Sequence, residues 1–239
     1  MKIVMYTINC SDNVKDVVEK LNNKKFGEDF IKARESKFSS NEIFIQYYYT
    51  ESIEDSLKKV IDDDILDEIV SVFRNNGHFK ILRKTFCFID VSRKTLEIYR
   101  GMDKKTEEIA NNIAKCLECE ISPMNIDPKK LLDIINKHST EVRQLVFSNV
   151  EGLFRKAYVG RHLERNNSIL NYLKNFYNYL TTITIKPKIR FLNWNSKYSV
   201  TINANKSTIS ISNGNNGIKF RPRFEIRQLT SFFCFLNKR

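Results

Sequence analysis

Apolar and polar residues alternate over several stretches of the chain, as they do in half-buried β-strands. This alternation predicts a strand at residues 2–8, and aromatic and β-branched residues predict another at 42–50. Two β-hairpins are predicted further on, over residues 79–100 and 142–159. The dominant expected element is therefore an antiparallel β-sheet.

Helical periodicity appears between these strands, with good capping residues at the expected starts. Ser11 or Asp12 is expected to cap a helix that runs to residue 22. Asp103 precedes apolar positions that follow the 3.6-residue period, and the pair Asp127-Pro128 is typical of a helix start. A further helix is expected over residues 168–180.

The last part of the chain is predicted to be an antiparallel meander. Its four strands are expected at residues 182–194, 197–203, 207–212 and 218–227, separated by turns rich in Asn and Gly. The apolar tail is expected to pack back as a helix or strand. The sequence thus predicts an α+β fold, an antiparallel sheet backed by helices.

A weak internal similarity accompanies this pattern. Residues 87–101 align with residues 146–160 at an offset of 59, and Phe, Val, Tyr and Gly coincide. Either two hairpins resemble each other by chance, or the chain contains a duplicated hairpin–helix unit. We expect a near-neutral N-terminal lobe at residues 1–139 and a basic C-terminal lobe at 140–239, within one compact body.

Charge is distributed unevenly between these lobes. The formal net charge is +12, and residues 155–239 hold 16 Lys and Arg against two acids, which is a net +14. Residues 51–68 are acidic, with eight acids and two lysines. That segment is expected to be a solvated face, or else a flap that competes with nucleic acid for the basic region. A basic excess of this kind points to a polyanionic partner, namely nucleic acid or an anionic membrane surface.

Cations of the predicted meander recur at alternate positions, which places them on one face of each strand. The opposite positions are apolar and are expected to cover the helix around Leu173. The alternating cations are Lys186, Lys188, Arg190, Lys219, Arg221, Arg223 and Arg227. Such a face would contact phosphates and release their counterions.

Two further features extend this candidate nucleic-acid-binding site. Arg161 and Arg165 precede the helix predicted from residue 168, whose N-terminus favours anions. Trp194 precedes a turn and is the best candidate for stacking on a base. The predicted function is therefore binding of DNA or RNA, mainly through the phosphate backbone.

Other classes of function have weaker support in the sequence. No nucleotide-binding loop, zinc-protease or hydrolase motif is present, and we assign no catalytic residue. A nuclease remains an alternative, because Asp90 with Glu97, or Asp29 with Glu35 and Lys37, are acids that a metal-dependent enzyme would use. A third alternative is an adaptor or assembly protein that docks an acidic partner.

The cysteines and the hydropathy pattern bear on location. Five cysteines without a secretory signal are expected to be reduced thiols, and the single C-x-x-C motif, Cys116 to Cys119, lacks the second pair that a zinc site needs. No apolar run approaches the roughly 20 residues that span a bilayer. We expect a cytoplasmic protein with no membrane insertion, no bound metal and no cofactor.

Overall fold

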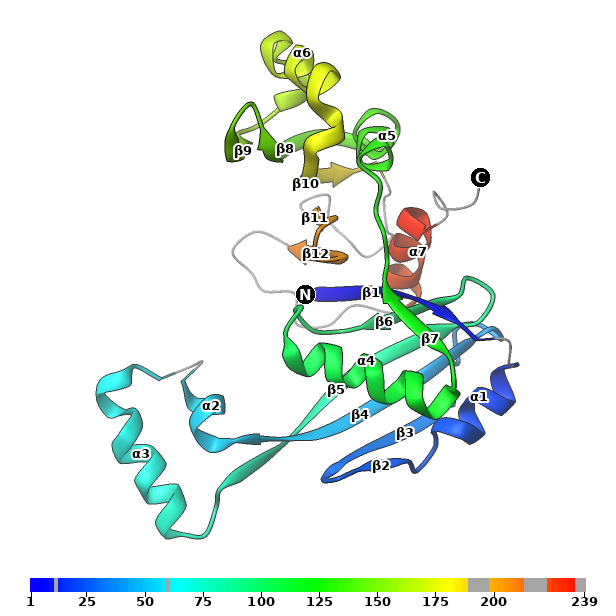
Figure 1. Cartoon of the computed structure of the whole chain (residues 1–239), viewed down its shortest axis with the longest axis vertical. Helices are drawn as coiled ribbons and strands as arrows, with labels where there is room; N and C mark the ends of the chain where they lie inside the picture. The colour runs from blue at the N-terminus through cyan, green and yellow to red at the C-terminus, as the bar shows by residue number, and fades with distance from the viewer. Residues whose placement is uncertain (11–12, 59–60, 189–197, 213–222, 235–239) are drawn as a thin grey trace.

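A single antiparallel sheet of 12 strands organises the protein (Figure 1). The computed structural model describes residues 1–10, 13–58, 61–188, 198–212 and 223–234. Along the sheet the strand order is β2-β3-β4-β5-β6-β1-β12-β11-β10-β8-β9, and β7 pairs with β1. Together with the seven α-helices found among these described residues, the sheet confirms the α+β class.

The N-terminal strands confirm most of the sequence predictions. The predicted strand at residues 2–8 and the hairpin over 79–100 are present, whereas β2, β3 and β7 were not predicted. The strands are β1 (Lys2–Asn9), β2 (Lys25–Phe26), β3 (Asp29–Glu35), β4 (Glu42–Ser52), β5 (Lys80–Asp90), β6 (Thr95–Ile98) and β7 (Glu120–Pro123).

The C-terminal strands and the helices complete the fold. The strands are β8 (Ser139–Val150), β9 (Leu153–Val159), β10 (Leu180–Pro187), β11 (Ser199–Asn203) and β12 (Thr208–Ser212). The α-helices are α1 (Val14–Leu21), α2 (Ile53–Leu57), α3 (Asp63–Asn75), α4 (Lys104–Leu117), α5 (Pro128–His138), α6 (Asn167–Phe176) and α7 (Arg223–Cys234).

Local capping explains where several helices begin. The side chain of Asp103 accepts a hydrogen bond from the backbone N–H of Thr106, and Asp127 accepts one from Lys129. Both predicted starts are confirmed. The N-cap of α1 is Asn13, and not Ser11 or Asp12 as predicted.

Helices cover the two halves of the sheet on opposite sides. Alternate residues of β1 show the division, since Val4 belongs to the core beneath α1 and α4, whereas Ile3 and Met5 belong to the core of α5, α6 and α7. We call these the α4 side and the α7 side. The opposite side of each half carries no such helical layer, although α7 packs on that side of the N-terminal half at Glu42, Phe88 and Glu97.

The two hairpins with similar sequences occupy different places in this arrangement. The β5–β6 hairpin is followed by α4 and lies inside the sheet, whereas β8–β9 is followed by α6 and β9 is an edge strand. Both follow the order of hairpin and then helix, but α4 and α6 lie on opposite sides. The predicted lobes share one sheet, because β1 pairs with β12.

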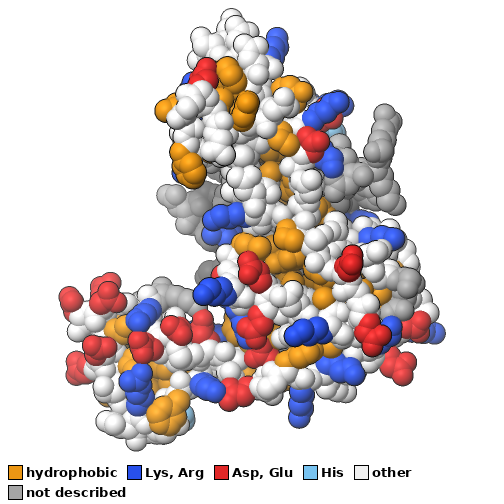
Figure 2. Space-filling view, in the orientation of Figure 1, with side chains coloured by type: hydrophobic (Ala, Val, Ile, Leu, Met, Phe, Trp, Pro, Cys, Tyr) orange, Lys and Arg blue, Asp and Glu red, His pale blue; other side chains and the backbone are white. Residues whose placement is uncertain are grey.

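The acidic segment forms an arm that extends from the ends of β4 and β5 (Figure 1). Acidic side chains gather on it (Figure 2). Glu54 pairs with Lys58 and Arg74, and Glu51 pairs with Arg83. The described partners of these carboxylates are thus cations of the arm and of β5, as expected of a solvated face.

The C-terminal element differs from its prediction. Residues 218–227 were expected to be a strand, but helix α7 begins at Arg223, and residues 218–222 lie outside the described part of the chain. The side chains of Ile226 and Leu229 on α7 are buried in the core of the α7 side. The alternation of charge in this segment misled the prediction, because its described cations, Arg223 and Arg227, lie on a helix and pair with acids of the sheet.

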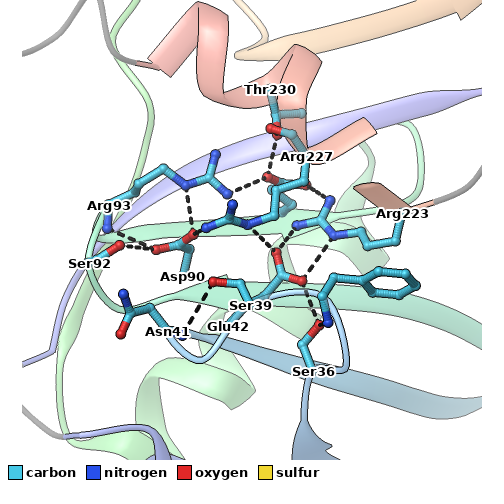
Figure 3. A network of polar contacts seen from close by, with 12 residues as sticks. Ser36, Ser39, Asn41, Glu42, Asp90, Ser92, Arg93, Arg223, Arg227 and Thr230 are labelled. Carbon is cyan, nitrogen blue, oxygen red and sulfur yellow. Dashed lines mark hydrogen bonds and ion pairs between the residues drawn. The ribbon is translucent and has the colours of Figure 1, made fainter. Parts of the chain in front are cut away.

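A buried cluster of ion pairs fixes α7 to the N-terminal half of the sheet (Figure 3). Arg223 lies between two carboxylates, 2.5 Å from Glu42 and 2.6 Å from Glu97. Its guanidinium also stacks 3.8 Å above the ring of Phe88. Both acids and the arginine side chain are at most 5% exposed, so the pairs are shielded from solvent.

Further groups complete this cluster, which we call the α7 ion cluster. Arg227 pairs with Asp90 at 2.7 Å and with Glu42 at 3.3 Å, and Arg93 pairs with Asp90 at 2.7 Å. The hydroxyl of Thr230 donates to Glu97 over 2.7 Å. Three arginines thus balance three acids, as buried charges require.

The pKa values of two members follow from their surroundings. Burial works to lower the pKa of Arg223, but the charges of Glu97, Tyr99 and Glu42 and the hydrogen bond to Glu42 together raise the pKa above its ordinary value. Burial works to raise the pKa of Asp90, yet the hydrogen bond from Ser92 and the charge of Arg93 hold it below its ordinary value. Both groups are therefore charged at neutral pH.

Replacing Arg223 with Met should destabilise the fold strongly. The substitution leaves Glu42 and Glu97 buried without their shared cation, which costs about 3–5 kcal/mol of unfolding free energy. Urea unfolding followed by circular dichroism measures this change. Arg165→Met is a matched control, because its side chain is 74% exposed, and it should change stability by about 0.5 kcal/mol or less. Equal effects of the two substitutions would contradict the role of the cluster.

Acid should weaken the docking of α7 through Asp90. Because its pKa is lowered in the folded state, the carboxylate contributes stability that is complete above its unfolded pKa of about 3.9 and is lost as pH falls through the folded pKa. Asp90→Asn should therefore lower stability at neutral pH and flatten the loss of stability below about pH 5. Unfolding free energies measured between neutral and acid pH test this. A variant whose acid profile parallels the parent protein would contradict it.

Candidate nucleic-acid interface

Four of the predicted binding residues lie outside the described part of the chain. They are Arg190, Trp194, Lys219 and Arg221. The remaining candidates are distributed over β10, the β9–α6 connection and α7. They do not form one cationic surface.

Lys186 lies on β10, and Lys188 follows the end of that strand. On β10 the apolar Ile183 and Ile185 point into the core that contains Leu173, as expected. Lys186 lies on the opposite side and forms an ion pair with the buried Glu141. Lys188, beyond the strand, donates from Nζ to the carbonyl oxygen of Lys137 at 2.9 Å.

Arg223 and Arg227 require a correction. Both were predicted on a solvent-exposed sheet face, but both lie on α7 and belong to the α7 ion cluster. Arg223 is buried, and Arg227 is only 26% exposed at its side chain. Their positive charges neutralise carboxylates of β4, β5 and β6, so these residues act in the fold.

Arg161 and Arg165 are exposed in the connection before α6, as predicted. The only described anion near Arg165 is Glu164, at 3.9 Å from its Nε. Helix α6 starts at Asn167, and the side chain of Asn166 caps it by accepting from Ile169 N–H. These two arginines remain candidate phosphate contacts.

The uncovered α4 side of the C-terminal strands is polar, and few of its described residues are cations. Thr184 and Thr201 lie 2.9 Å apart between their hydroxyl oxygens, and Ser199 and Ser212 lie 2.8 Å apart. Gln144 accepts from Thr184 at 3.0 Å. Hydroxyl groups line this surface, whereas the sequence predicted a dense row of Lys and Arg side chains.

A second uncovered surface lies on the α7 side of β3, β4 and β5, and it combines aromatic rings with cations. The cross-strand register places one residue of each strand opposite its neighbour, so the members of this face follow directly from the pairing. The face, which we call the aromatic–cationic face, consists of Phe30, Lys32, Arg34, Phe44, Gln46, Tyr48, Lys84 and Phe86.

The opposite residues of the same strands explain why this face is presented so regularly. Ile31, Ile45 and Cys87 are fully buried against α1 and α4, which fixes the strands from behind. The pairing of β4 with both neighbours runs without register shifts. A rigid, regular surface of three strands results.

Aromatic rings form two groups across the strands. Phe30 and Tyr48 are stacked, with ring centroids 4.4 Å apart and planes 7° apart. Phe44 lies 5.6 Å from Phe86 and 5.2 Å from Phe88, in tilted arrangements. Except for Phe88, which Arg223 covers, these rings are partly buried and keep some exposed area.

Exposed cations stand over these rings. Lys32 Nζ lies 5.6 Å from the ring centroid of Tyr48, and Lys84 Nζ lies 5.3 Å from that of Phe86. The guanidinium of Arg34 is 4.8 Å from the ring of Phe44. These are cation–π distances, and no acid among the described residues forms an ion pair with Lys32, Arg34 or Lys84.

The charge on this side of the strands is strongly positive. Lys25 and Lys80 occupy the same side, by their pairing with Phe30 and Ser52. Glu28 is beside them and accepts from Lys80 at 2.6 Å and from Thr50 at 2.7 Å. Five cations therefore accompany one described exposed acid here, although the N-terminal 154 residues carry a net charge of −2.

The sequence carried a partial signal for this face. The 42–50 segment was predicted as a strand because of its aromatic residues, and its even-numbered positions, Phe44 and Tyr48, form the face. The partner strand β3 was not predicted, so Lys32 and Arg34 could not be placed beside them. Net charge summed over the lobe concealed the local excess.

The acids considered for a metal-dependent nuclease are engaged in other contacts. Asp90 and Glu97 belong to the α7 ion cluster, and Asp29 accepts from Lys105 at 2.6 Å and from Tyr47 at 3.0 Å. Within the described ranges, no group of three or more His, Cys, Asp or Glu residues is arranged to hold a metal ion.

Comparisons with known proteins do not identify a family. No family model matches the chain, and a search of curated proteins finds no significant match. Among the described helices, none is long and apolar enough to cross a membrane.

Proposed function

We propose that this protein binds nucleic acid, with the aromatic–cationic face as its principal contact surface. The observation that carries the proposal is the combination on one uncovered sheet face of exposed cations and partly exposed rings. Cations neutralise phosphates, and ring faces contact bases. A surface that bound only the phosphate backbone would need cations but no accessible aromatic rings.

The net charge of the C-terminal third is a second argument for the same function. Residues 155–239 carry a net charge of +14, and the exposed Arg161 and Arg165 belong to it. A positive field of this strength attracts a polyanion and accelerates its association. The proposal thus keeps Arg161, Arg165 and Lys188 as peripheral phosphate contacts and places the main surface on β3, β4 and β5.

Cytoplasmic action is part of this proposal. Cys87 and Cys116 are free thiols in the structure, and Cys116 is only partly buried. A partly accessible thiol of this kind is typical of a protein in a reducing compartment. Such a compartment also contains the proposed ligand.

Reversing the charge of the face should abolish binding. The variant Lys32→Glu/Arg34→Glu/Lys84→Glu removes three phosphate contacts and adds repulsion, so it should lower the affinity at least 100-fold and the salt slope by about two. Fluorescence anisotropy with labelled DNA and RNA oligonucleotides, at several salt concentrations, measures both quantities.

A matched control has the same change in charge elsewhere. Lys15, Lys104 and Lys129 are exposed residues of α1, α4 and α5, and their replacement by Glu should reduce affinity far less. If both triple variants lose binding equally, net charge alone explains the affinity and the assignment of the face fails. If the parent protein binds no nucleic acid even at low salt, the proposed function is wrong.

A further inference from the structure

We infer that the aromatic–cationic face is a base-stacking platform selective for single-stranded DNA or RNA. This inference rests on the proposed function and adds the class of nucleic acid. Its basis is the arrangement of the rings: Phe30, Tyr48, Phe44 and Phe86 lie on three adjacent strands with part of their surface accessible.

Only unpaired bases present their faces to such a surface. In a duplex the bases stack on one another and expose their edges and the phosphates, whereas bases of a single strand splay onto aromatic side chains. The strands β3, β4 and β5 form a sheet surface whose described neighbours leave the rings accessible. An extended strand fits on such a surface, and a sheet of this size accommodates about two or three bases.

The cations over the rings suit the same ligand. Lys32 and Lys84 have flexible side chains that lie 5.3–6.0 Å from the ring centroids. When a base takes the ring face, the ammonium groups need move only a short way to reach the adjoining phosphates. Arg34 has a planar guanidinium, which stacks on a base as it now does on Phe44.

Two boundaries define the extent of the platform. At one end α7 closes it, because Arg223 covers the ring of Phe88 at 3.8 Å. At the other end Glu28 holds Lys80 and Thr50. Between them the polar side chain of Gln46 is the one described member of the face that is neither a ring nor a cation. Stacking therefore dominates base contact, and we expect little sequence preference.

Removing a ring while retaining every charge tests the inference. Tyr48→Ala should weaken binding of a labelled oligo(dT) or oligo(U) about tenfold, because one stacking contact is lost. Tyr48→Phe keeps the ring and should restore the parent affinity. Fluorescence anisotropy measures these affinities, and thermal unfolding verifies that each variant is folded.

Exposed aromatic residues elsewhere provide the matched control. Phe154 and Tyr179 are 85% and 45% exposed and lie outside the face. Their replacement by Ala should leave oligo(dT) affinity within about twofold of the parent protein. An abasic strand of the same length should bind the parent protein more weakly than oligo(dT) binds Tyr48→Ala, because the abasic strand lacks every stacking contact and the variant lacks only one.

Competition with duplex DNA of the same length completes the experiment. Single strands should bind at least tenfold more tightly at 150 mM salt, where screening weakens phosphate contacts. Equal binding of duplex, or full affinity of Tyr48→Ala, would overturn the stacking platform while leaving nucleic-acid binding intact. Failure of the parent protein to bind any strand would instead refute the proposed function and this inference together.

Discussion

The guanidinium of Arg223 allows two carboxylates, one on β4 and one on β6, to be buried beneath α7 away from solvent. Glu42 and Glu97 come from β4 and β6, and without a cation their burial would be strongly unfavourable. Arg223 comes from the far end of the chain, 181 residues beyond Glu42. The position of α7 across the middle of the sheet follows from this pairing as much as from its apolar residues.

This constraint also divides the surface. Helices α1 and α4 pack on one side of the N-terminal strands, and α5, α6 and α7 pack on the other side of the C-terminal strands. Each half keeps an opposite surface outside these two cores, and in the N-terminal half α7 covers the end of that surface near Phe88. These two surfaces differ chemically. Hydroxyl groups line one of them, and rings with cations line the other, so the described residues of the second are the ones that suit the proposed contacts to phosphates and bases.

Local signals predicted the fold class, the hairpins and the helix starts at Asp103 and Asp127, because hydrophobic periodicity and capping depend on neighbouring residues. They failed at Arg223 and Arg227. Alternation of cations with apolar residues is compatible with an exposed strand, but their actual partners are acids more than 100 residues earlier, which no local window contains.

The candidate site was partly accessible to the same reasoning. The rings of β4 were noticed as strand formers, yet a face needs its neighbouring strands, and β3 has a weak pattern of its own. Which strands pair is decided by burial against α1 and α4. The site prediction therefore failed for two reasons. It needed the order of the strands in the sheet, and it used the net charge of a whole lobe, which conceals a local excess of cations.

The pairing of β1 with β12 links the beginning of the chain to a strand near its end, and the backbone of Met1 bonds with that of Ile211 across 210 residues. During synthesis, β1 emerges from the ribosome long before this neighbour exists. Until β12 is synthesised, the edge of β1 that pairs with it has no partner strand. Until α7 is synthesised, the carboxylates of Glu42, Asp90 and Glu97 lack the arginines of that helix. A chain truncated before α7 would keep these buried carboxylates without Arg223 and Arg227, which is strongly unfavourable.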